Sequence, residues 1–194
     1  MDNVGKEITE YTIGLGRAHL IILLMAVPII IIIGVPFFLV WDMDTFESGR
    51  KVFMNNIILY LIVGVIMHEM LHGAGWALFA PRGIRSLKFG IHWKYLAPYC
   101  HCREPLKVKH YRIGGALPLF LLGIAPSLFA IATGNGALLS FGIIFSIAAG
   151  GDIISLYMLR KFDGESYIHD HPDKMGFYVE SRPVNDIVTN GNKK

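Results

Sequence analysis

The sequence has few charged residues and almost no cysteine. Charged side chains make up 17% of its 194 residues, against about 25% in a typical soluble domain. With 53% hydrophobic residues, the composition argues against both a disordered chain and an ordinary soluble domain. The net charge of +3 is too small for the basic surface of a nucleic-acid-binding protein, so we expect no nucleic-acid partner. Two cysteines, Cys100 and Cys102, cannot build the disulfide framework of a small secreted protein.

Long apolar stretches occupy much of the chain instead. They cover residues 18–41, 52–80, 113–132 and 137–159. Each is long enough for a transmembrane helix, which needs about 20 apolar residues. The first is too long for a signal peptide and is followed by no small-residue cleavage site, so we interpret it as a retained span. The sequence therefore predicts an all-α polytopic membrane protein with four transmembrane helices in a single domain, residues 1–194.

The basic residues are distributed unevenly between the connecting segments. The loop 81–112 has eight Lys or Arg residues against one acid, Glu104. Because basic loops stay on the cytoplasmic side, this loop is predicted to be cytoplasmic. With four spans, both termini and the polar tail 160–194 are then cytoplasmic as well. We expect the protein to lie in the cell membrane, with the lipid bilayer as its first partner.

The same loop contains a pattern typical of β-structure. Apolar and polar residues alternate along residues 86–95, which predicts a strand with one buried face. A turn signal, Ala97-Pro98, precedes a possible returning strand at residues 99–103. We therefore expect a small cytoplasmic β-hairpin between the second and third spans. The tail is predicted to be mostly extended.

Two acidic residues, Glu69 and Asp152, are the only charged residues inside the four apolar stretches. A carboxylate in a membrane helix is costly, which makes it a candidate functional group. Glu69 belongs to the motif His68-Glu69-Met70-Leu71-His72. On a helix, His68 and His72 lie one turn apart on one face, where both imidazoles can bind one zinc ion. Glu69 would lie close enough to accept a proton from the attacking water.

Asp152 is the candidate for a third zinc ligand. His72 lies eight residues before Ala80, the end of its apolar stretch, which is about 12 Å of helix. Asp152 lies seven residues before Leu159, about 10 Å by the same measure. The two residues are therefore expected at one depth, with small residues nearby to let the helices approach closely. A competing third ligand could come from the tail or from His92.

These features together resemble a known family. A helical H-E-x-x-H motif, a basic loop with a strand, Asp152 in a Gly-Asp motif and the segment Asp170-His171-Pro172 are similar to the family of small membrane proteins described as putative zincin peptidases. That family is related in type to site-two intramembrane zinc proteases. The resemblance implies Zn²⁺ as cofactor, with His68, His72 and Asp152 as its ligands and Glu69 as the general base. We expect a zinc metallopeptidase that hydrolyses peptide bonds of membrane or juxtamembrane substrates at or within the cytoplasmic leaflet.

Other interpretations stay open at this point. The protein could be a membrane scaffold or chaperone that binds zinc without cleaving, or a transporter with an intramembrane relay of His, Glu and Asp. A second metal site could involve Cys100 and Cys102, or His169 and His171. The predicted strand at residues 87–95 could pair with an extended substrate. The sequence gives no indication of the oligomeric state.

Overall fold

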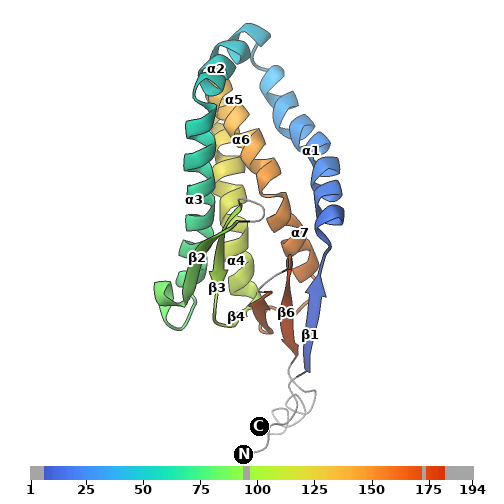
Figure 1. Ribbon diagram of the computed structural model, residues 1–194. Helices are drawn as coiled ribbons and strands as arrows, with labels where there is room; N and C mark the ends of the chain where they lie inside the picture. Colours follow the sequence, from blue (N-terminus) through green and yellow to red (C-terminus); the bar gives the residue numbers. More distant parts are fainter. Residues whose placement is uncertain (1–6, 94–96, 172–173, 182–194) are drawn as a thin grey trace, which may run out of the picture.

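The helices of the computed structural model stand side by side, and the strands gather at one end of them (Figure 1). The structure describes residues 7–93, 97–171 and 174–181. Three described helical segments are long and apolar enough to cross a membrane, namely Leu15–Phe38, Ile57–Ala77 and Val108–Thr133. A bent helix pair makes a fourth if it counts as one span. The chain is thus mostly helical, with three to four candidate membrane spans and two small antiparallel sheets.

The first span is α1 (Leu15–Phe38), which is followed by a shorter helix, α2 (Met43–Asn55). The Asp42 carboxylate caps α2 by accepting a hydrogen bond from the Thr45 backbone N–H at 2.8 Å. In Figure 1, α2 crosses the bundle at the end opposite the strands. The second span, α3 (Ile57–Ala77), begins only after a break at Asn56. The predicted span 52–80 was therefore wrong at its start, because residues 52–55 belong to α2.

The third span is one helical segment in three parts, α4 (Val108–Pro118), the π-helical η2 (Leu119–Ile124) and α5 (Ala125–Thr133). It starts before the predicted 113–132 because polar residues form its first turn. Gly134 ends it in a left-handed conformation with φ of 73°. Asn135 then caps the next helix by accepting hydrogen bonds from two backbone N–H groups.

The predicted fourth span, 137–159, consists of two helices. These are α6 (Gly136–Ala148) and α7 (Gly150–Leu159), which meet at an angle of 46°. Gly150 leaves room for the side chain of Ile22, because a Cβ there would lie 2.8 Å from its Cγ1. The bend places Asp152 in the first turn of α7.

A β-hairpin follows α3, as the alternating pattern predicted. The strands β2 (Leu87–His92) and β3 (Ala97–Cys102) pair antiparallel, with Leu87 opposite Cys102. A short 3-10 turn, η1 (Gly83–Ser86), connects the hairpin to α3. Gly73 of α3 faces the side chains of Phe89, Leu87 and Cys100. The hairpin therefore packs directly on the helix that carries the H-E-x-x-H motif.

A second sheet makes the prediction of an all-α fold with one hairpin incomplete. Its strand order is β1 (Glu7–Thr12), β6 (Gly176–Ser181), β5 (Tyr167–Asp170) and β4 (Leu106–Lys107), and every pair is antiparallel. It joins segments from before the first span, between spans and from the tail. Its core includes Leu106, Ile168 and Phe177, packed with Trp76 and Leu159 from the ends of the helices. Burial of these side chains against the helices holds the sheet below the bundle.

Candidate metal centre

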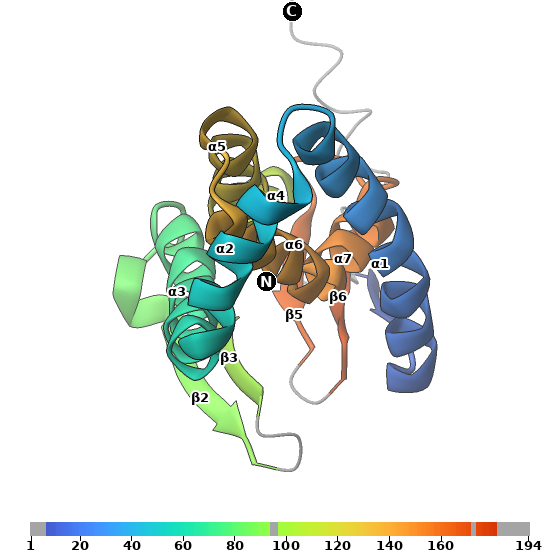
Figure 2. The same ribbon diagram turned by 90° about the horizontal axis from the view of Figure 1, so that it is seen from above.

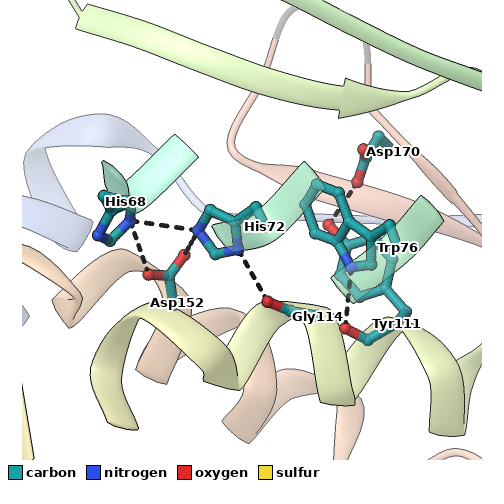
Figure 3. Close-up of polar contacts among 7 residues, drawn as sticks. All are labelled: His68, His72, Trp76, Tyr111, Gly114, Asp152 and Asp170. Carbon is teal, nitrogen blue, oxygen red and sulfur yellow. Dashed lines mark hydrogen bonds and ion pairs between the residues drawn. The ribbon is translucent and has the colours of Figure 1, made fainter. Parts of the chain in front are cut away.

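The helix α3 presents His68 and His72 on one face, as the motif spacing predicts. Their Nε2 atoms lie 3.2 Å apart. Asp152 of α7 reaches the same point, with its two carboxylate oxygens 3.2 Å from His68 Nε2 and 3.2 Å from His72 Nε2 (Figure 3). The predicted equal depth of the two helices is thus reproduced in the geometry. Among the described residues, this is the only group of three or more His, Cys, Asp or Glu whose ligand atoms converge, all within 4.8 Å of one another.

The donor set suits zinc. Two imidazole nitrogens and one carboxylate oxygen are ordinary zinc ligands, and a catalytic zinc site uses three of them and leaves a position open. Asp152 Oδ2 is buried and makes no hydrogen bond within the described chain, and its neighbour is His68 Nε2 at 3.2 Å. A cation held by these side chains would compensate the carboxylate, because a buried anion is costly unless its charge is paired. The residues that converge here therefore fit a zinc ion.

A third helix orients His72. The His72 Nδ1–H donates a hydrogen bond of 3.0 Å to the Gly114 carbonyl of α4 (Figure 3). Because Nδ1 carries the proton of this bond, Nε2 points toward Asp152 and can bind a metal. Metal-binding histidines usually donate their other ring N–H in this way. The approach is possible because two glycines meet: a Cβ at Gly75 would lie 2.5 Å from Gly114 Cα. The small residues near His72 thus let α3 approach α4, whereas we had expected them to bring α3 and α7 together.

Aromatic rings continue from His72 toward the sheet. Trp76 stacks on His72 at a centroid distance of 5.1 Å, and Tyr111 stacks on Trp76 at 4.9 Å. The Trp76 Nε1–H donates to the Tyr111 carbonyl at 3.1 Å. The Tyr111 hydroxyl in turn donates to Asp170 of β5 (Figure 3). This row of side chains connects the cluster on the helices to the sheet.

The cluster lies in a cavity of about 680 Å³. Its lining includes His68, Glu69, His72 and Asp152. Side chains of the β2–β3 hairpin and of the β5–β6 region complete it. Viewed from above, β2 and β3 lie under α3, and β5 and β6 lie on the side of α7 (Figure 2). Glu69 lines the cavity, and the backbone amide of Cys100 faces its carboxylate. The cavity therefore places Glu69 beside the cluster.

The other candidate ligands whose side chains the structure describes do not belong to this converging group. Burial raises the pKa of the Cys100 thiol to about 12 and also raises the pKa of Cys102. These thiols are therefore protonated near neutrality, and only thiolates bind metal well. His169 and His171 contact Glu180 and Glu10. The side chain of His92 lies outside the described residues, so the hypothesis that it is a third ligand is not addressed.

Sequence reasoning missed Trp76, Tyr111 and the bridging role of Asp170. The only available signal for Asp170 was its place in the Asp-His-Pro segment. Trp76 follows His72 by four residues and so shares its helix face, which could have suggested a contact with the motif.

A comparison with protein families gives a match over residues 61–167, to the family described as "putative zincin peptidase". The chain belongs to this family. The matched region contains the H-E-x-x-H motif, the hairpin and Asp152, and it confirms the resemblance drawn from these residues. The family assignment points to a zinc metallopeptidase and to zinc as the metal. No curated protein and no solved structure matches the chain.

Proposed function

We propose that the protein is a membrane-embedded zinc metallopeptidase that hydrolyses peptide bonds of membrane or juxtamembrane substrates. The observation that carries the proposal is the convergence of His68, His72 and Asp152, at distances of 3.2 Å, in a cavity that Glu69 also lines. The family assignment supports the same chemistry.

In this proposal His68, His72 and Asp152 hold the zinc ion, and the Gly114 carbonyl keeps the His72 ring in place. A bound zinc ion supplies Lewis-acid polarisation of the scissile carbonyl and makes water more acidic. Glu69 accepts a proton from the attacking water as its oxygen bonds to the carbonyl carbon. Glu69 then delivers that proton to the amide nitrogen as the C–N bond breaks, which releases a carboxylic acid and an amine. The acid proton then passes to the amine, so the products leave as a carboxylate and an ammonium group.

We further propose that the substrate binds in extended form along β3. An extended backbone can add to the open edge of a sheet through main-chain hydrogen bonds. The two-stranded sheet leaves one edge of β3 without a strand partner in the described chain. That edge borders the cavity, where the Cys100 backbone amide faces Glu69 and the Cys102 N–H donates to Asp170 at 3.1 Å. A substrate strand would take over these two N–H groups. We therefore favour β3 over the strand at residues 87–95 as the pairing strand.

In this proposal, the distribution of basic residues decides to which side of the membrane the cavity opens. The basic loop 81–112 contains both strands of the hairpin and adjoins the cavity. Under the positive-inside rule the cavity opens to the cytoplasm, and both termini lie there. Substrates would then be cut at or near the cytoplasmic leaflet.

The decisive experiment compares the wild-type protein with Glu69→Gln, both loaded with zinc. Glu69→Gln removes the base and preserves the shape of the side chain, so it should bind zinc normally and lose cleavage. Membrane proteins that co-purify with this variant, and disappear from cells containing wild-type protein, are the candidate substrates. Equal fragment patterns from both proteins would refute the role of Glu69. Zinc binding without any cleavage by the wild-type protein would favour the alternative of a non-catalytic zinc-binding scaffold.

A further inference from the structure

The cavity is also lined by basic side chains that do not belong to the metal cluster. These are Lys88, His101, His171 and Lys174. Lys88 and His101 are directly opposite each other in the β2–β3 register. The side chains of directly opposed residues project from the same face of a hairpin and lie close together. They can therefore contact the same group of a ligand.

Asp170 fixes the position of His101. The Asp170 Oδ2 atom lies 3.3 Å from His101 Nδ1 and also accepts the Cys102 N–H. The other oxygen, Oδ1, accepts the Tyr111 hydroxyl. Three donors thus engage this carboxylate, which is only 10% exposed. Asp170 therefore holds the ring, and Nε2 is the His101 nitrogen that a ligand can use.

His171 and Lys174, which lie between β5 and β6, are paired with an acidic residue. Glu10 of β1 lies 3.3 Å from His171 Nε2 and 2.7 Å from Lys174 Nζ. These two side chains are held toward β1. Lys88 and His101 are therefore the two bases of the lining that we consider for binding a ligand. Lys88 has an exposed side chain on β2.

We propose that Lys88 and His101 form a subsite that binds a carboxylate of the peptide substrate, and this inference rests on the proposed peptidase function. Lysine and protonated histidine bind carboxylates through charge-assisted hydrogen bonds. Trp76 and Tyr111 separate the metal cluster from Asp170, with ring centroids 5.1 Å apart between His72 and Trp76 and 4.9 Å apart between Trp76 and Tyr111. An extended peptide rises about 3.3 Å per residue, so a substrate that follows this row of rings spans it with about three residues. We therefore place its acidic residue about three residues from the cleaved bond.

A peptide fits this subsite better than a lipid phosphate does. The two bases and the metal cluster line one cavity, so a ligand that contacts both must extend along it. A peptide chain has this form and brings a scissile bond to Glu69. An anionic headgroup would satisfy the bases without using the cluster, and it is the competing outcome of the test.

The test uses full-length, zinc-loaded protein in detergent and two peptide hydroxamates that differ only in Asp or Asn three residues from the hydroxamate. We expect the wild-type protein to bind the Asp peptide about tenfold more tightly. Lys88→Gln and His101→Gln should each reduce that preference, because they weaken binding of the Asp peptide more than binding of the Asn peptide. Arg85→Gln, which removes an exposed base of the same loop outside the cavity lining, is the matched control and should preserve the preference.

Each contrary result identifies what has failed. Equal binding of the two peptides by the wild-type protein would overturn the subsite and leave the peptidase proposal intact. A parallel loss of affinity for both peptides in the Lys88 and His101 variants would assign these residues a structural role. Loss of the Asp preference on adding phosphatidylglycerol to the micelles, with Asn-peptide binding unchanged, would assign the subsite to lipid. If neither hydroxamate binds the zinc-loaded protein, the peptidase proposal itself fails.

Discussion

The contact between Gly75 and Gly114 offers a test of how the helices support the metal cluster. A methyl group at Gly75 would lie 2.5 Å from Gly114 Cα, whereas carbon atoms in contact prefer about 3.5 Å or more. In Gly75→Ala, α3 and α4 must therefore separate by about 1 Å. If α4 moves by that amount, the bond from His72 Nδ1 to the Gly114 carbonyl lengthens from 3.0 Å to about 4 Å, which is beyond hydrogen-bond range.

Two losses should follow from this separation. Overpacking of a tight interface lowers the free energy of unfolding by about 1–3 kcal/mol. Loss of the hydrogen bond that orients a metal-binding histidine lowers metal affinity by about 10–100-fold. Thermal unfolding in detergent measures the first loss, and competition with a fluorescent zinc chelator measures the second.

Gly115→Ala is the matched control on α4, at the glycine next to Gly114 that faces α7 instead of α3. A Cβ at Gly115 would meet only Leu156 Cδ2 at 3.5 Å and Cγ at 4.0 Å, which is ordinary contact. This variant should keep both stability and zinc affinity. The reasoning is refuted if Gly75→Ala binds zinc as tightly as the wild-type protein, or if both variants lose the same affinity.

Two further predictions concern Glu165 and Cys100, which lie outside the candidate membrane spans. Lys107 and Lys109 hold the pKa of Glu165 at about 2, below its usual value of 4.5, so these ion pairs stabilise the fold above pH 4.5 and are lost as the pH falls toward 2. The wild-type melting temperature should therefore fall more between pH 5 and pH 3 than that of Glu165→Gln, and parallel curves would contradict the pairing. Burial raises the pKa of the Cys100 thiol to about 12, so native protein at pH 8 should react with iodoacetamide much more slowly than unfolded protein. Equal labelling rates at Cys100 would show that this thiol is accessible.

The parts of the fold that the sequence predicted are those with a local pattern. Continuous apolar runs predicted the membrane helices, and alternation in residues 86–95 predicted the strand now seen as β2. The break at Asn56 and the bend between α6 and α7 were missed, because both lie inside apolar runs without a charged residue at the boundary. The strand β1 was missed because its partner β6 is far from it in the sequence. Pairing between distant segments leaves no local signal in the sequence.

The candidate site divides in the same way. His68, Glu69 and His72 follow from one motif, and Asp152 follows from the cost of a carboxylate in an apolar stretch. Both arguments depend on residue type and spacing. The Gly114 carbonyl, the Trp76–Tyr111 stack and the Asp170 contacts depend on which helices and strands are neighbours. Only the folded structure contains that information.

Zinc content per chain decides whether His68, His72 and Asp152 form a metal site. We expect one zinc ion per wild-type chain after purification, and its loss in His68→Ala and in Asp152→Ala. Ser155→Ala, which alters the lining of the same cavity without touching the proposed ligand set, should keep the full amount. Wild-type protein with clearly less than one zinc per chain, or a zinc content unchanged by the His68 and Asp152 substitutions, would contradict the account.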